Sequence, residues 1–145
     1  MGAVDTMLEK IGKKEVVVGV IGLGYVGLPL AVTFARKDVQ VLGFEKWEER
    51  AAKVNAAENY IGDVKDEDLV RVVKETKKLA ATTDFARLKE CDAIMICVPT
   101  PLDRFKKPDM SFIESSSVDI GRNMKKGTLV SLESTTYPTT TEDFM

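Results

Sequence analysis

The 145-residue sequence contains no histidine at all, and this absence narrows the chemistry available to the chain. Without an imidazole, proton transfer within this chain has to use Glu, Asp, Lys, Tyr, Cys or water. Only two cysteines are present, Cys91 and Cys97, and they lack the C-x-x-C spacing of a metal or redox site. We therefore expect no disulfide scaffold and no bound metal. Cys91 lies at the end of a predicted helix and Cys97 lies in a predicted buried strand, so we assign both thiols structural roles.

Long apolar runs, an N-terminal leader pattern and a strong excess of one charge are also missing. No run is long enough to span a bilayer, and the net charge is −2. We therefore expect neither nucleic acid nor a membrane as a partner. With 44% hydrophobic and 30% charged residues, the composition is that of a globular protein. The length suits one domain over residues 1–145, which we expect to be cytoplasmic.

A glycine-rich loop between a predicted strand and a predicted helix is the most informative segment. Residues 16–21 form an apolar, largely β-branched run, typical of a strand buried on both faces. Residues 28–36 are apolar and carry Pro29 where a first helical turn tolerates proline. Between them, Gly22-Leu23-Gly24-Tyr25-Val26-Gly27 matches G-x-G-x-x-G in the strand–loop–helix context of dinucleotide binding.

Each glycine of this loop has a predicted role. Gly22 allows the tight turn, Gly24 allows a pyrophosphate to approach the backbone, and Gly27 allows close packing of helix on strand. The N-terminus of the following helix offers amide donors and the positive end of its dipole to the phosphates.

A carboxylate at the end of the next strand supports the dinucleotide hypothesis. Glu45 lies 18 residues beyond Gly27, close to the separation of about 20 at which an acid meets the adenosine ribose. Its oxygens can accept from the ribose hydroxyls and repel a 2′-phosphate, which favours NAD over NADP. The neighbouring cations Lys46 and Arg50 weaken the argument against a phosphate.

Strand-like and helix-like segments alternate along the chain. A short helix at about 4–12 precedes the first strand, and the later predicted strands are 40–44, 79–83, 93–98 and 128–133. The later helices are predicted at 47–57, 66–77, 84–90, 111–124 and from 138 onward, with a charged loop at 102–108. This alternation predicts a Rossmann-type, doubly wound α/β fold with a parallel sheet of order 3-2-1-4-5. The sixth strand is missing because the sequence stops inside a helix, so we interpret the chain as a fragment of a longer protein.

Two further motifs follow predicted strands, and ligands bind at the carboxyl ends of strands in such sheets. Val98-Pro99-Thr100-Pro101 places two stiff prolines and a hydroxyl there, although a simple strand-ending turn has the same composition. Glu133-Ser134-Thr135-Thr136-Tyr137-Pro138 gathers hydroxyls and a carboxylate, although helix caps use the same residue types.

Together with residues 20–29 (VIGLGYVGLP), these motifs resemble the UDP-glucose/GDP-mannose dehydrogenase family. The resemblance covers essentially the whole chain, as the family's N-terminal NAD-binding domain. The leading helix, Pro108-Asp109 and the run at 133–138 are most similar to the UDP-N-acetyl-hexosamine 6-dehydrogenases, which act on glucosamine or mannosamine derivatives.

The resemblance implies a two-step oxidation of a UDP-sugar, in which the C6 alcohol becomes a carboxylate and two NAD are reduced, as in polysaccharide biosynthesis. The family carries its catalytic cysteine, lysine and aspartate on later domains, so we expect this chain alone to be inactive. It also implies that most of the UDP-sugar site lies outside this chain and that the full-length enzyme is a homo-oligomer.

Site residues follow from the loop and from the resemblance. Thr135 matches a threonine that helps to place a water or proton near the reacting carbon, as well as a cofactor contact. Two positions depart from the family pattern: Glu45 stands where aspartate is usual, and Thr139 stands where glycine is usual. The predicted cofactor-binding residues are Gly22, Gly24, Tyr25, Val26, Gly27, Glu45, Arg50, Thr100 and Thr135.

Two other functions remain open from the sequence. One is a stand-alone NAD-binding or regulatory module without catalysis. The other is a different β-hydroxyacid-type dehydrogenase, against which the run Glu133-Ser134-Thr135 argues.

Overall fold

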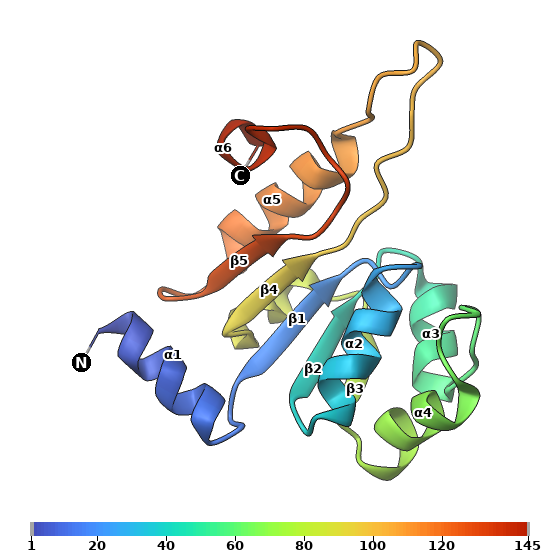
Figure 1. Ribbon diagram of the computed structural model, residues 1–145, viewed down its shortest axis with the longest axis vertical. Coiled ribbons are helices and arrows are strands. Elements are labelled where there is room, and N and C mark those ends of the chain that lie inside the picture. Colours follow the sequence, from blue (N-terminus) through green and yellow to red (C-terminus); the bar gives the residue numbers. More distant parts are fainter. Residues whose placement is uncertain (1, 145) are drawn as a thin grey trace.

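A five-stranded parallel sheet forms the centre of the computed structural model, which describes residues 2–144 (Figure 1). The strands lie in the order β3-β2-β1-β4-β5, as the sequence predicts. Their bounds are β1 Val17–Ile21, β2 Gln40–Phe44, β3 Leu79–Thr82, β4 Ala93–Ile96 and β5 Leu129–Leu132.

The first strand lies in the middle of the sheet because its side chains can be buried on both faces. Val20 and Ile21 are almost completely inaccessible, and they point to opposite faces. Parallel pairing places Ile21 beside Phe44 of β2 and beside Ile96 of β4. The carboxyl ends of three strands therefore meet at one edge of the sheet.

Helices cover one face of the sheet through a continuous apolar core. This face is covered by α2 (Gly27–Arg36), α3 (Glu48–Ala56) and the segment that begins with α4 (Asp66–Val70). Leu28 and Val32 of α2 pack in the same cluster as Val20 and Val41 of the sheet. Alternation along the strands sends the remaining side chains to the opposite face.

The opposite face is covered by η2 (Phe85–Glu90), a 3₁₀ helix, and by α5 (Ser111–Asn123). Leu88 of η2 and Ile120 of α5 pack with Ile21, Phe44 and Ile94 of the sheet. The structure therefore has the doubly wound, Rossmann-type arrangement that the strand and helix alternation predicts.

Three predicted elements differ in detail. The helix predicted over 66–77 divides into α4 and a π-helical turn, η1 (Arg71–Glu75), because the backbone shifts to the wider i+5 pattern before β3. The last helix begins at Thr140 rather than at 138, and α6 (Thr140–Phe144) is described up to residue 144; Met145 lies outside the described residues. The loop at 102–108 contains an antiparallel bridge between Leu102 and Pro108.

The N-terminal helix α1 (Ala3–Gly12) lies beside the sheet, at the left of Figure 1. No residue of this helix is buried. Lys10 connects this helix to the sheet, because its Nζ lies 2.7 Å from the carboxylate of Asp92, the residue before β4. None of the helices within residues 2–144 is both long and apolar enough to cross a membrane.

Asp92 is a buried carboxylate that joins three parts of the chain. It accepts hydrogen bonds from Lys10 and Lys125 (2.7 Å each) and from the amide of Val17 (2.9 Å). Burial by itself raises the pKa of this carboxyl, but these donors outweigh it and lower the pKa from 3.8 to about 2. The carboxylate therefore stabilises the folded chain wherever it is ionised.

Replacing Asp92 with asparagine is expected to lower the free energy of unfolding at neutral pH by about 1–3 kcal/mol. The lower half of this range is favoured because Lys10 and Lys125 are more than a third exposed and can be hydrated instead. Urea unfolding measures the change, with Asp63→Asn at an exposed position as the matched control.

The pH dependence provides a second check on the role of Asp92. Because its pKa is lowered on folding, its contribution is present above about pH 4 and is lost as the pH falls through 2. The stability difference between the wild type and Asp92→Asn should therefore shrink over this interval. A difference that is constant down to pH 2 would contradict the assignment.

Candidate functional site

A cavity of about 810 Å³ opens at the carboxyl ends of β1, β2 and β4. Its volume is within the range of about 300–1,000 Å³ that small-molecule sites occupy. Eight of the nine predicted cofactor residues line it: Gly22, Gly24, Tyr25, Val26, Glu45, Arg50, Thr100 and Thr135. Gly27, the ninth, is buried behind the loop at the start of α2.

The three glycines of the loop differ in whether the structure leaves space for a side chain. Gly22 has a φ of +87°, in the region that favours glycine, and a Cβ there would lie 2.8 Å from the carbonyl oxygen of Cys97. A Cβ at Gly27 would lie 1.6 Å from the carbonyl oxygen of Gly22. A Cβ at Gly24 would meet nothing within 4 Å, so the space beside this residue is open.

The loop presents amide groups at the N-terminus of α2. The amides of Gly24, Tyr25 and Val26 donate to no backbone carbonyl within residues 2–144, and Leu28 is the first to bond back into the turn, at 3.1 Å from the Gly24 oxygen. Free amides at a helix N-terminus together with the helix dipole favour an anion. This part of the cavity is therefore suited to phosphate groups.

Glu45 is buried at the edge of the cavity and already has protein partners. Its Oε2 accepts from the amide of Leu23 at 3.2 Å and from the guanidinium of Arg50 at 3.4 Å. Its Oε1 accepts from the amide of Trp47 at 3.4 Å. The carboxylate thus has a fixed position beside the loop, and its remaining lone pairs are available to hydroxyl donors.

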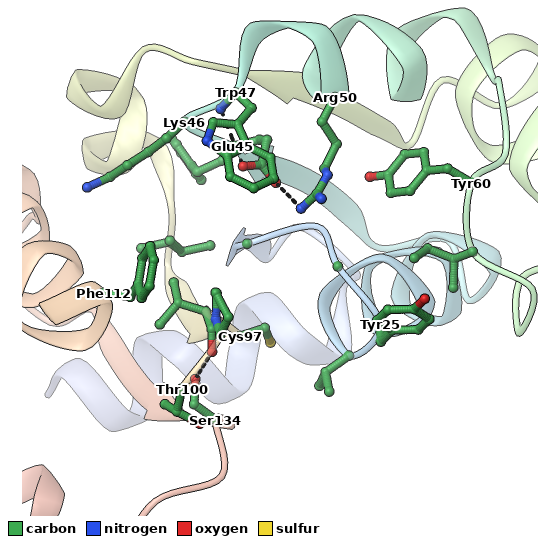
Figure 2. Close-up of a pocket in the computed structure, with 18 of the residues that line it drawn as sticks. Tyr25, Glu45, Lys46, Trp47, Arg50, Tyr60, Cys97, Thr100, Phe112 and Ser134 are labelled. Atoms are coloured by element: carbon green, nitrogen blue, oxygen red, sulfur yellow. Dashed lines mark hydrogen bonds and ion pairs between the residues drawn. The ribbon is translucent and has the colours of Figure 1, made fainter. Parts of the chain in front are cut away.

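Arg50 lies between two aromatic rings, as Figure 2 shows for the Tyr60 side. Its Cζ is 4.6 Å from the ring centroid of Trp47 and 5.5 Å from that of Tyr60. The Tyr60 hydroxyl donates to the carbonyl oxygen of Leu23 at 2.6 Å. Burial raises the pKa of Tyr60 to about 12, so the hydroxyl remains protonated at neutral pH.

Sequence reasoning missed Trp47, Tyr60 and Phe112 as residues that line the cavity. Tyr60 belongs to a segment that resembles an ordinary loop, and its partner lies 37 residues away. For Tyr60, the signal in the sequence was an aromatic residue within an otherwise polar loop. Aromatic side chains can provide apolar surface for a flat ring in such a site.

Lys46 follows Glu45 directly but extends toward α5. Its Nζ donates to the hydroxyl of Ser115 and lies 3.9 Å from Asp119, both on α5, and 5.9 Å from the ring centroid of Phe85. Figure 2 shows its side chain extending away from Arg50. Of the two cations that weaken the argument against a 2′-phosphate, Lys46 is thus engaged with α5, whereas Arg50 lines the cavity and is paired with Glu45.

The loops after β4 and β5 are tied together by hydroxyl groups. Thr100 Oγ1 donates to the carbonyl oxygen of Thr135 at 2.7 Å, and Ser134 Oγ donates to the carbonyl oxygen of Val98 at 2.8 Å.

Thr139, where the family usually has glycine, has a φ of +73°. This position therefore adopts a backbone conformation that favours glycine although it carries threonine. Threonine is thus held here in a conformation that residues with a Cβ rarely adopt.

Both cysteines are buried free thiols. Burial raises the pKa of Cys91 and of Cys97 to about 12, with the nearby carboxylates Glu90 and Glu133 respectively acting in the same direction. Thiols with such pKa values stay protonated and are poor nucleophiles at neutral pH. The structural roles predicted for them agree with this environment.

Comparison with known proteins identifies the family. The model of the UDP-glucose/GDP-mannose dehydrogenase family, NAD binding domain, matches residues 16–145. The chain belongs to this family. NAD is accordingly its cofactor, and a different β-hydroxyacid-type dehydrogenase is no longer an alternative.

Members of the family with similar sequences are nucleotide-sugar dehydrogenases. UDP-N-acetyl-D-glucosamine 6-dehydrogenase of Pseudomonas aeruginosa is 39% identical over 130 residues, which is 90% of this chain and 30% of that protein. UDP-N-acetyl-D-mannosamine dehydrogenase of Salmonella typhi is 38% identical over 125 residues, covering 86% of this chain and 29% of the relative. The chain thus spans about 30% of the length of these relatives.

A solved structure supports the same relation. The UDP-D-ManNAc dehydrogenase of Pyrococcus horikoshii superposes with a TM-score of 0.82 and 36% identity, covering 88% of this chain and 30% of that one. The family relation thus extends from the sequence motifs to the arrangement of the whole sheet.

Proposed function

We propose that this chain is the NAD-binding half of an NAD-dependent UDP-sugar 6-dehydrogenase, of the kind that oxidises UDP-N-acetyl-hexosamines at C6. The observation that carries the proposal is the juxtaposition of free loop amides and a buried carboxylate on one cavity. Gly24, Tyr25 and Val26 supply the amides, and Glu45 supplies the carboxylate. NAD has a matching pyrophosphate and a matching pair of ribose hydroxyls.

Each proposed site residue has a distinct task. The loop amides bind the pyrophosphate, and Glu45 accepts hydrogen bonds from the adenosine ribose. Thr100 and Thr135 lie on the tied loops after β4 and β5, where the other end of the cofactor would be held. Thr135 additionally places a water or proton near the reacting carbon. NAD, when bound, supplies the hydride acceptor for the oxidation.

We expect this chain to bind NAD more tightly than NADP. A 2′-phosphate would face the negative charge of Glu45. Arg50 is already paired with that carboxylate, and Lys46 is engaged with Ser115 and Asp119 on α5. Titration calorimetry with both cofactors measures the preference. Equal or tighter binding of NADP would refute the role of Glu45.

Two substitutions at Glu45 separate the effect of its charge on cofactor binding from the effect of its hydrogen-bonding oxygen atoms. Glu45→Ala should weaken NAD binding by about 1–3 kcal/mol, because charge-assisted hydrogen bonds are lost. Glu45→Gln keeps an acceptor for the Leu23 amide and removes the charge that repels a phosphate. The ratio of NADP to NAD affinity should therefore rise in Glu45→Gln, and an unchanged ratio would count against the proposal.

A stand-alone NAD-binding module without catalysis is the second candidate, because the chain contains no histidine and its two cysteines are buried, protonated thiols. Both candidates predict that the 145-residue chain forms no NADH when it is mixed with NAD and UDP-N-acetylglucosamine. They differ for the protein extended to its relatives' length, which oxidises the sugar only under the dehydrogenase proposal. Following NADH absorbance for both proteins distinguishes them, and turnover by the 145-residue chain would refute the assignment of catalysis to later domains.

We also propose a cytoplasmic, homo-oligomeric full-length enzyme that takes a UDP-sugar as its substrate. The support is the kinship with nucleotide-sugar dehydrogenases. Sedimentation of the extended protein tests the oligomeric state.

A further inference from the structure

Leu23, the residue between the first two glycines of the loop, is fixed by contacts of its amide, its carbonyl oxygen and its side chain. Its amide donates to Glu45 at 3.2 Å, and its carbonyl oxygen accepts from the Tyr60 hydroxyl at 2.6 Å. Its side chain is fully buried against β2, where a Cβ on Gly43 would lie 2.8 Å from Leu23 Cδ1. The residue between the two glycines of the G-x-G turn is therefore anchored through its amide, its carbonyl oxygen and its side chain.

The two hydrogen bonds fix two different peptide planes. Because a peptide group is planar, the Gly22 carbonyl shares a plane with the Leu23 amide, and the Leu23 carbonyl shares a plane with the Gly24 amide. The first plane is held by Glu45 and is also packed against Gly27. The second plane contains a loop amide that donates to no backbone carbonyl of residues 2–144, and Tyr60 holds it through the Leu23 oxygen.

We propose that Tyr60 is a positioning residue for the cofactor's pyrophosphate, acting through the Leu23–Gly24 peptide. Its hydroxyl sets the direction of the Gly24 amide before any ligand arrives, so the loop need not be ordered on binding. Pre-ordering of this kind raises affinity by reducing the entropy lost on association. The inference rests on the proposed binding of a dinucleotide at this loop.

The residues around Tyr60 fix its ring and keep its hydroxyl protonated, so that it can donate to the Leu23 carbonyl. The ring is fixed beside Arg50, which is itself paired with Glu45, so both anchors of Leu23 belong to one connected group. The high pKa of Tyr60, about 12, ensures that the hydroxyl donates throughout the neutral range. A phenylalanine could fill the same space, but it would leave the Leu23 carbonyl without this donor.

Tyr60→Phe tests the proposal when several ligands are compared. Binding of NAD and of ADP-ribose should weaken by about five- to tenfold, as expected for the loss of one hydrogen bond at a buried group. Binding of adenosine, which has no pyrophosphate, should be unchanged. Calorimetry and NMR titration of the 145-residue chain provide the dissociation constants, and Tyr137→Phe, which removes a hydroxyl outside the cavity lining, is the matched control.

The other outcomes are equally informative. Equal weakening for adenosine and NAD, together with a lower melting temperature, would assign Tyr60 a purely structural role and overturn the proposal. Undiminished NAD binding by Tyr60→Phe would also overturn it. Failure of the wild type to bind NAD would instead refute the proposed function.

A measurement on the unliganded chains tests the ordering of the loop without any ligand. If Tyr60 orders the Leu23–Gly24 peptide, the NMR order parameter of the Gly24 amide should be that of rigid backbone before NAD is added, and it should fall in unliganded Tyr60→Phe. A low order parameter in the wild type, or the same value in both chains, would overturn the proposal.

Discussion

Gly27→Ala is expected to destabilise the folded chain by about 4 kcal/mol or more, which is exceptional for a single added methyl group. A Cβ at this position would lie 1.6 Å from the carbonyl oxygen of Gly22 and 3.2 Å from the Cβ of Cys97. The nearest of these atoms is backbone and cannot rotate away. Relief therefore requires α2 to move off the sheet, which would open the core around Leu28 and Val32.

Urea unfolding of Gly27→Ala measures this effect, and Gly121→Ala is the matched control. Gly121 lies inside α5, where a Cβ would meet nothing within 4 Å. Alanine there should stabilise the helix by about 0.5–1 kcal/mol, because it restricts the unfolded chain. A Gly27→Ala chain as stable as the wild type would show that the contact between the helix and the loop is looser than described.

Gly24→Val is expected to abolish detectable NAD binding, with at least a roughly 100-fold loss of affinity, or about 2.7 kcal/mol. A Cβ here meets no protein atom within 4 Å, and positive φ occurs at Gly22 rather than at Gly24. The valine side chain would thus be accepted by the fold but would project into the open space beside the loop amides. The loss should come from the ligand site alone.

Melting temperature and calorimetry together separate these effects. The Gly24→Val chain should melt within a few degrees of the wild type, since that shift corresponds to less than about 1 kcal/mol. Gly62→Val, at a glycine that also has open space beside it but does not line the cavity, should bind NAD normally. Normal NAD binding by a folded Gly24→Val chain would mean that the loop is only a turn.

These two glycines illustrate what a short motif can and cannot specify. Both belong to G-x-G-x-x-G. The motif predicts that glycine is needed at Gly24 for the approach of a pyrophosphate and at Gly27 for close packing of helix on strand. In the structure, an added Cβ would clash at Gly27, whereas the space beside Gly24 is open. The expected separation between folding and binding follows from that difference.

The sequence by itself determined the layers, the strand order and the edge of the sheet at which the cavity opens. These features follow from local patterns: the period of apolar residues, the β-branched run at 16–21 and the glycine spacing at 22–27. Each pattern is read within a few residues, and right-handed crossovers then leave few possible topologies. The boundary errors at 66–77 and at 138 arose where the ends of helices depend on packing rather than on local composition.

Only the tertiary structure decided which side chains face the loop and what they contact. Glu45 reaches Leu23 across 22 residues, Tyr60 reaches it across 37, and Lys46 reaches Ser115 across 69. Such contacts depend on where separate elements stop and how they twist against one another, which no local pattern encodes. The acid could therefore be predicted from its spacing. Its bond to the loop, the aromatic residues around Arg50 and the engagement of Lys46 with α5 emerge only when the sheet brings these segments together.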